Sequence, residues 1–360
     1  MMRSFLSGVG ALLVLMAGYA HAAQVGEMHR VAAEPSASLR DAHHRPQVAV
    51  TVWYPAAADA VEQDGVIGPP GKPVFDVGPA APDAPFAPDG ARLPVILLSH
   101  GFGGSARMMG WFGIAMARDG YVVIAVDHPG NNGTDTMTVA GAVLRWDRAE
   151  DLRVALTAAE HDPAIGPHLD LSRVGVAGFS AGGFTALVAA GARVDPDHFT
   201  QFCLANPDDG VCRPQKEFKM TEQDIAELFR RPEVQEDASH ATADHSIPEV
   251  RAAFVMAPAL VQSLDPASLT RMHTPVEIML GDADPVAPPA TNGLVAAKMI
   301  PNATLIRLPG VGHYDFLAPC TADARAVVPV CKTSVPQDDT HRRAIEAARI
   351  FFGHELGAAH

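Results

Sequence analysis

The chain has 360 residues, of which 48% are hydrophobic and 19% are charged. This composition excludes an intrinsically disordered protein and provides enough apolar residues for a buried core. The formal net charge is −14, from 41 acidic and 27 basic residues without a dense basic block, which argues against a nucleic-acid partner.

The N-terminal segment, residues 1–22, has the pattern of a secretory signal peptide. Arg3 gives a basic start, residues 9–16 form an apolar run, and an Ala-His-Ala cleavage motif ends at Ala22. The alternative is a membrane anchor, which needs an apolar run of about 20 residues, and this run is too short for one. We therefore predict an exported protein, periplasmic or secreted, that is cleaved near Ala22 and has no stable membrane anchor.

Strands and helices are expected to alternate along most of the remaining chain. Residues 47–54 alternate and are rich in β-branched side chains, which predicts a strand. Residues 56–92 contain seven prolines and five glycines, which predicts a loop or extended connection and not a packed element. The later expected strands are 94–99, 120–126, 170–178, 251–257, 275–280 and 303–308, and the expected helices are 105–118, 145–160, 181–190 and 341–352. This order predicts a mostly parallel sheet with helices on both faces.

One segment, residues 192–250, interrupts the alternation. It is polar and mixed in composition, with one expected helix at 221–231. Because it lies between an expected helix and an expected strand, we interpret it as a cap-like insertion over one edge of the sheet and not as an independent domain.

A G-x-S-x-G motif, residues 178–182, lies between an expected strand and an expected helix. A strand-to-helix turn this sharp requires small flanking residues and lifts the serine hydroxyl above the sheet. The alternative is a chance match to a short pattern, and the strand-turn-helix context argues against it. The motif predicts Ser180 as a nucleophile.

A serine hydroxyl is a weak nucleophile at neutral pH and needs a base that is oriented by a carboxylate. His313 and Asp284 each follow one of the last two expected strands, at the same sheet edge as Ser180 and in the order serine, acid, histidine. Asp282 is the alternative acid, although it could instead cap the turn. Two other histidines, His273 before a strand and His341 at the start of the last helix, are expected to be surface imidazoles.

The negative charge of a tetrahedral intermediate needs two backbone N–H donors. One comes from the residue after the nucleophile, which here is Ala181. The other is expected from the glycine-rich turn at residues 100–104, where Phe102 is the candidate donor. The alternative reading of this stretch is an ordinary turn.

Five segments, taken in order, resemble the α/β-hydrolase fold. More narrowly, they resemble bacterial proteins described as predicted dienelactone hydrolases, which share features with platelet-activating-factor acetylhydrolases. These segments are residues 50–55, 98–104, 120–130, 174–183 and 312–317. The resemblance implies a serine hydrolase with Ser180, Asp284 and His313 as a catalytic triad. After the signal peptide, we predict a single catalytic domain, residues 23–360. True dienelactone hydrolases use a cysteine nucleophile, whereas this chain has serine there.

The four cysteines are expected to pair with their nearest neighbours, as Cys203–Cys212 and Cys320–Cys331, among three possible connectivities. They lack the close Cys-x-x-Cys spacing that zinc prefers, so we predict no metal and no cofactor.

Several other side chains stand at strand ends near the predicted site, and they predict an apolar pocket for an acyl chain or an aromatic ester group. They are His128, Phe179, Tyr314 and Phe316, with core packing an equal alternative for Phe316.

Together these features predict an exported serine esterase for short or medium acyl esters, with aromatic esters and polyesters as further candidates. The alternatives are an amidase or peptidase with the same triad, and a non-catalytic binding protein. The expected partner is a small-molecule or polymeric ester, and the oligomeric state is open.

Overall fold

The computed structural model describes residues 23–88, 90–333 and 335–357. The predicted signal peptide, residues 1–22, lies outside the described residues. Within the described ranges, none of the helices combines the length and apolar character needed to cross a membrane.

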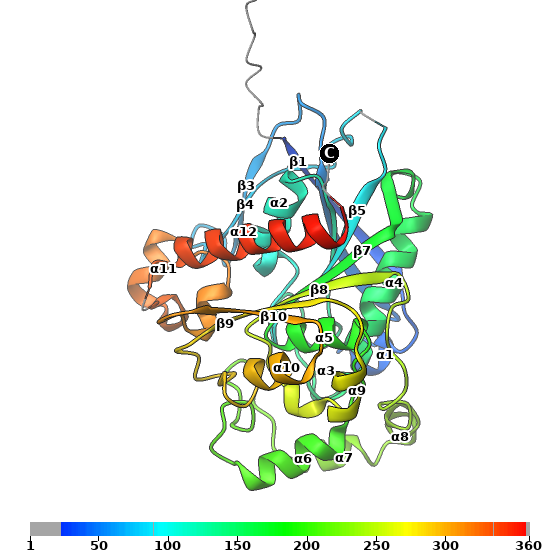
Figure 1. The fold of residues 1–360 in the computed structure, drawn as a ribbon, viewed down its shortest axis with the longest axis vertical. Helices are drawn as coiled ribbons and strands as arrows, with labels where there is room; N and C mark the ends of the chain where they lie inside the picture. Colours follow the sequence, from blue (N-terminus) through cyan, green and yellow to red (C-terminus); the bar gives the residue numbers. More distant parts are fainter. Residues whose placement is uncertain (1–22, 89, 334, 358–360) are drawn as a thin grey trace, which may run out of the picture.

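The centre of the molecule is a twisted ten-stranded sheet in the order β10-β9-β8-β7-β5-β6-β2-β1-β4-β3 (Figure 1). The first six strands of that order run parallel to one another, and β2 joins them antiparallel to β6. The strands are β1 (Val25–Ala33), β2 (Gln47–Pro55), β3 (Gln63–Ile67), β4 (Phe75–Pro82), β5 (Leu93–Ser99), β6 (Val122–Asp127), β7 (Leu169–Phe179), β8 (Val250–Met256), β9 (Val276–Gly281) and β10 (Ala303–Leu308). All seven residues of β5 are buried, as expected for a strand covered on both faces.

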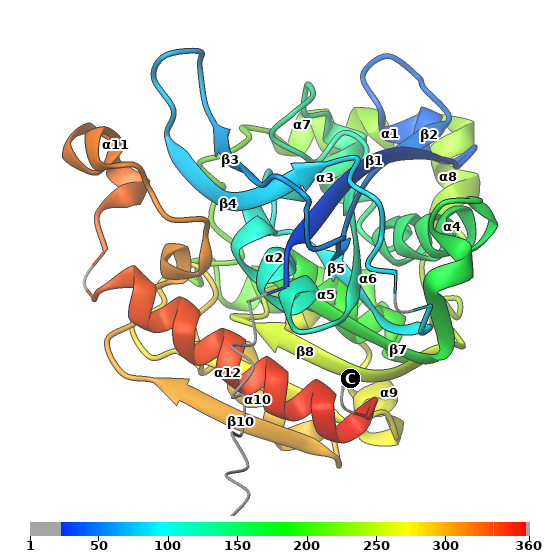
Figure 2. The same ribbon diagram turned by 90° about the horizontal axis from the view of Figure 1, so that it is seen from above.

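Helices cover both faces of the sheet and create two hydrophobic cores. The helices α2 and α12 pack on one face, and α4 and α5 pack on the other (Figures 1 and 2). The helices are α1 (Ala37–Arg40), α2 (Gly110–Arg118), α3 (Val139–Val143), α4 (Asp147–His161), α5 (Ala181–Ala189), α6 (Pro196–Ala205), α7 (Glu222–Leu228), α8 (Pro232–Ala238), α9 (Pro266–Arg271), α10 (Gly293–Met299), α11 (Ala322–Val327) and α12 (Gln337–Glu355). The predicted doubly wound α/β architecture is confirmed.

The N-terminal part of the sheet corrects the sequence interpretation. The stretch at residues 56–92, predicted to be a loop, contains the antiparallel strands β3 and β4, and β4 extends the sheet through the unpredicted strand β1. Proline is tolerated in such peripheral strands because few backbone N–H donors are needed there. Val77 and Ala80 of β4 are nevertheless buried in the core beside α2, so this segment is a packed element.

The insertion, residues 192–250, contains three helices, α6, α7 and α8, where one was expected. Each begins at a local signal: Asp195 caps α6, Thr221 and Asp224 form a capping box at α7, and Pro232 opens α8. Side chains of α6 and α7 face a cavity that also contains Ser180, so these helices lie beside the predicted site.

Candidate active site

Ser180 sits in a strained turn between the end of β7 and the start of α5. Its backbone has φ 56° and ψ −120°, a region that few residues other than glycine adopt. Two backbone hydrogen bonds hold the turn: the Ser180 N–H donates to the Met256 carbonyl at 2.9 Å, and the Ser180 carbonyl accepts from the Ala259 N–H at 3.1 Å. Neighbouring strands and loops therefore hold the turn in this conformation.

The glycines of the motif are required by close backbone contacts. A Cβ on Gly178 would lie 2.0 Å from the Gly182 carbonyl oxygen, and a Cβ on Gly182 would lie 2.0 Å from the Ser99 carbonyl oxygen. The spacing G-x-S-x-G thus lets β7, α5 and the end of β5 approach closely enough to form the turn.

We expect Gly182→Ala to lower the free energy of unfolding by about 1–3 kcal/mol, because its Cβ overlaps backbone atoms that cannot easily move. Gly353→Ala is the matched control, since its Cβ would meet no heavy atom within 4 Å and α12 gains a better helix former. Urea unfolding of the two variants measures the difference. Equal stability of both variants would show that the turn can relax without cost.

His313 joins Ser180 to Asp284 in a hydrogen-bonded chain. Its Nε2 lies 2.8 Å from the Ser180 Oγ, and its Nδ1 lies 2.6 Å from an Asp284 carboxylate oxygen. All three side chains are buried. A carboxylate can only accept, so Nδ1 carries the proton and Nε2 is free to accept from the serine hydroxyl. The other Asp284 oxygen accepts the backbone N–H groups of Val286 and Ala287, each at 2.8 Å.

The alternative candidates lie away from this chain of hydrogen bonds. Asp282 accepts from the Arg307 guanidinium at 2.8 Å and points toward β10. His273 is exposed, as expected. His341 was expected at the surface but is buried, because its ring stacks on Trp111 at 3.8 Å between ring centres. Burial lowers the pKa of His341 to about 4, so the ring is neutral at physiological pH.

The two predicted oxyanion donors lie beside the serine. The N–H groups of Phe102 and Ala181 have no hydrogen-bond partner among the described residues, and both residues line a cavity together with Ser180. Two free amides next to a serine hydroxyl are what a developing oxyanion requires.

A buried polar network lies under the turn that carries Phe102. The Arg148 guanidinium donates to the His100 carbonyl oxygen in that turn and, at 2.9 Å, to the Thr185 hydroxyl on α5. The Thr185 hydroxyl in turn donates to the Ala181 carbonyl at 3.0 Å. Arg148 therefore connects the two segments that carry the candidate oxyanion donors, and nothing in the sequence pattern indicated this role.

His128 belongs to the same network and not to the pocket, which corrects its predicted position. Its Nδ1 lies 2.8 Å from Asp151 and its Nε2 lies 2.8 Å from the Ser99 hydroxyl. Burial, with a contribution from Arg148, lowers the pKa of His128 to about 3, so the imidazole is neutral. The group has the residue types of a triad, but Ser99, His128 and Asp151 are fully shielded from solvent, so no substrate reaches them.

Two cavities open at Ser180. The larger cavity, about 460 Å³, is lined mainly by apolar side chains of the insertion, including Phe199, Phe218, Met220 and Ile225. The smaller cavity, about 240 Å³, contains His313 and two of the predicted pocket residues, Phe179 and Tyr314. The fourth predicted pocket residue, Phe316, lies in the core with no exposed surface, because it packs against Phe179 from behind.

The insertion supplies site residues that the sequence interpretation missed. The Tyr314 hydroxyl donates to Glu217 of the insertion at 2.9 Å, beside the smaller cavity.

Disulfides join Cys203 to Cys212 and Cys320 to Cys331, which is the expected nearest-neighbour pairing. The first of these disulfides lines the larger cavity. No short motif marks these residues, because only folding brings the insertion over the serine.

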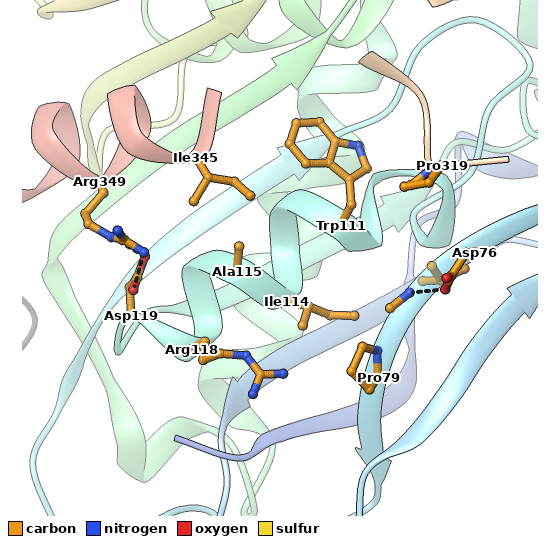
Figure 3. Close-up of a pocket in the computed structure, with 12 residues that line it drawn as sticks. Asp76, Pro79, Trp111, Ile114, Ala115, Arg118, Asp119, Pro319, Ile345 and Arg349 are labelled. Carbon is orange, nitrogen blue, oxygen red and sulfur yellow. Dashed lines mark hydrogen bonds and ion pairs between the residues drawn. The ribbon is translucent and has the colours of Figure 1, made fainter. Parts of the chain in front are cut away.

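A third cavity, about 410 Å³, lies far from this chemistry, between β4, α2 and α12 (Figure 3). Its Asp119 and Arg349 pair with each other at 2.8 Å, and Arg118 pairs with Glu62 at 3.0 Å. With its basic groups paired and none of the predicted catalytic residues present, this cavity lacks the features of a reaction site.

Comparisons with known proteins agree with the fold. No curated protein is significantly similar in sequence. A ferulic acid esterase from Streptomyces cinnamoneus has a similar structure, with 19% identity, a TM-score of 0.61, and coverage of 94% of this chain and 92% of that chain. The sequence profile described as "Alpha/beta hydrolase family" matches residues 95–328, which is more than half of the chain, so this protein belongs to the alpha/beta hydrolase family.

Proposed function

We propose that this protein is a serine hydrolase that cleaves carboxylic esters. The proposal depends on one observation: the hydrogen-bonded chain from Ser180 through His313 to Asp284, which ends at two cavities. Family membership supports a hydrolase, and the name of the structurally similar ferulic acid esterase supports an ester substrate.

The geometry suits acyl transfer through a covalent intermediate. His313 Nε2 takes the proton as the Ser180 Oγ attacks the ester carbonyl, and Asp284 stabilises the resulting imidazolium. The amides of Phe102 and Ala181 would hold the oxyanion. His313 then protonates the leaving alcohol and activates water, which releases the acid and restores the serine.

The substrate range and the location of the enzyme are further parts of the proposal. The apolar walls of the larger cavity favour short or medium acyl chains and aromatic groups, with polyesters as further candidates. The signal-like pattern of residues 1–22 and the two disulfides favour an exported enzyme. Amide or peptide hydrolysis by the same residues is the second candidate function, because the same hydrogen-bonded chain can serve it.

The decisive experiment compares the mature protein with Ser180→Ala on p-nitrophenyl acetate and p-nitrophenyl butyrate. We expect the substitution to lower kcat by about 10⁴-fold or more, because the nucleophile is lost. A fluorophosphonate probe should label the unmodified protein at Ser180 and leave the variant unlabelled. Equal rates for the two proteins, or labelling at a different serine, would refute the proposal. If the expected difference is found, a panel of esters, lactones, amides and polyesters defines the substrate class.

A further inference from the structure

The larger cavity contains a cation without an acidic partner. Arg145, in the short connection between α3 and α4, lines this cavity together with Ser180, Phe102 and Ala181. Among the described residues, its Nε has no hydrogen-bond partner and is shielded from solvent, and no carboxylate lies within 4.0 Å of its guanidinium. Its close neighbour is the Phe199 ring, whose centre lies 4.4 Å from the guanidinium carbon.

Arg145 differs from two more deeply buried arginines near the site, because both of those have polar partners. Arg148 donates to the His100 carbonyl oxygen and to the Thr185 hydroxyl. Arg40 is held between Asp147 and Asp151, both within ion-pair distance. For Arg145, burial lowers the pKa to about 10 and no acidic group raises it, so it is still a cation at neutral pH. An uncompensated cation in an apolar cavity is costly unless a ligand supplies the negative charge.

The rest of the lining gives the shape of that ligand. Most of the wall is apolar, and the second arginine on it, Arg213, is exposed and paired with Asp208 at 3.3 Å. The acid on the wall, Glu222, lies in the first turn of α7 and makes no ion pair with Arg145. Arg145 and Ser180 line the same cavity, and its volume of about 460 Å³ accommodates one small organic molecule.

We propose that Arg145 binds a free carboxylate on the ester substrate, so that the preferred substrates are anionic esters. These would be half-esters of dicarboxylic acids, or hydroxylated aromatic acids that are acylated on the hydroxyl group and keep a free carboxylate. The planar guanidinium offers parallel N–H donors that match the two oxygens of a carboxylate, and the apolar wall holds the carbon skeleton between that carboxylate and Ser180. The inference rests on the proposed esterase function and specifies its substrate class.

The test uses two pairs of substrates in which a carboxylate replaces a methyl group. Monomethyl adipate is compared with methyl hexanoate for the acyl side, and 4-acetoxybenzoate with 4-tolyl acetate for the alcohol side. We expect Arg145→Met to lower kcat/KM for the anionic member of at least one pair by about tenfold to hundredfold, the effect of losing a charge-assisted hydrogen bond. The neutral member should change by about twofold or less, because its contacts with the apolar wall remain. Arg153→Met is the control, because Arg153 is an exposed arginine of α4 that does not line the cavity, and it should leave both members unchanged.

Further variants separate an anion site from a structural role in packing against Phe199. Arg145→Lys keeps the charge and should retain part of the preference for the anionic ester, whereas Arg145→Met should abolish it. Equal losses for the anionic and neutral esters, or no loss for either, would overturn the proposal.

A binding measurement separates this inference from the esterase assignment. If the unmodified protein hydrolyses no ester, the proposed function fails, but calorimetric titration of Ser180→Ala with adipate still tests the site. We expect Arg145→Met, added to Ser180→Ala, to weaken adipate binding by about tenfold or more. Unchanged binding, or no binding in either protein, would show that Arg145 is not an anion site.

Discussion

Replacing Asp284 with asparagine should reduce kcat on p-nitrophenyl butyrate by about 10⁴-fold, while the same change at Asp282 should leave it within about twofold. The physical reason lies in the second oxygen of Asp284, which accepts two backbone N–H groups, from Val286 and Ala287. An asparagine keeps its carbonyl oxygen toward these donors and turns its amide NH₂ toward His313. Nδ1 must then accept, the proton moves to Nε2, and the imidazole can no longer take the serine proton.

Asp282→Asn is a close control, because the residue lies two positions away in the same loop and carries the same charge. It loses an exposed ion pair with Arg307, which contributes about 0–1 kcal/mol to stability. Steady-state kinetics of both variants, with circular dichroism to confirm folding, measure the contrast. A larger loss of kcat for Asp282→Asn than for Asp284→Asn would show that Asp284 is not the acid of the triad.

Asp151→Asn should lower the free energy of unfolding by about 3–5 kcal/mol, the cost of removing one partner of a buried ion pair, because Arg40 then has only Asp147 within ion-pair distance. The Arg40 guanidinium donates to both oxygens of Asp151 at 2.9 Å, and His128 lies 2.8 Å from the same carboxylate. Burial by itself would raise the pKa of Asp151, but Arg40 and His128 outweigh it and hold the pKa below its usual value. The ionised form is therefore the one that the native structure stabilises.

The pH dependence of this effect follows from the direction of the pKa shift. Because the Asp151 pKa is lower in the folded protein, its stabilising contribution is complete above the unfolded value of about 4 and is lost as pH falls below it. Urea unfolding at several pH values should show a constant deficit in the variant near neutrality and a shrinking one in acid. Asp170→Asn, which breaks the partly exposed pair with Arg173, is the control and should cost about 1 kcal/mol or less. Equal losses for the two variants would show that the buried network contributes no more than a surface pair.

The sequence interpretation was most accurate for the parallel part of the sheet. Continuous apolar runs such as residues 94–99 are typical of strands covered on both faces, and they coincide with β5 and its neighbours. It was least accurate where local composition misleads. The prolines and glycines of residues 56–92 suggest a loop, but pairing with β1 makes β4 a strand. Such pairing depends on a partner that is distant in sequence, which a local pattern does not contain.

By itself, the sequence determined the alternation of strands and helices, the strained turn at Ser180, and the order in which candidate acid and base follow it. These features are local, because each depends on residue types within a few positions of one another. Only the tertiary structure showed that Asp284 and not Asp282 contacts His313, and that His128 and Phe316 are buried. It also showed that the insertion and Arg145 line the cavity that contains Ser180. These outcomes depend on side chains that approach from distant segments, and burial and hydrogen bonding between such segments arise only when the sheet has formed.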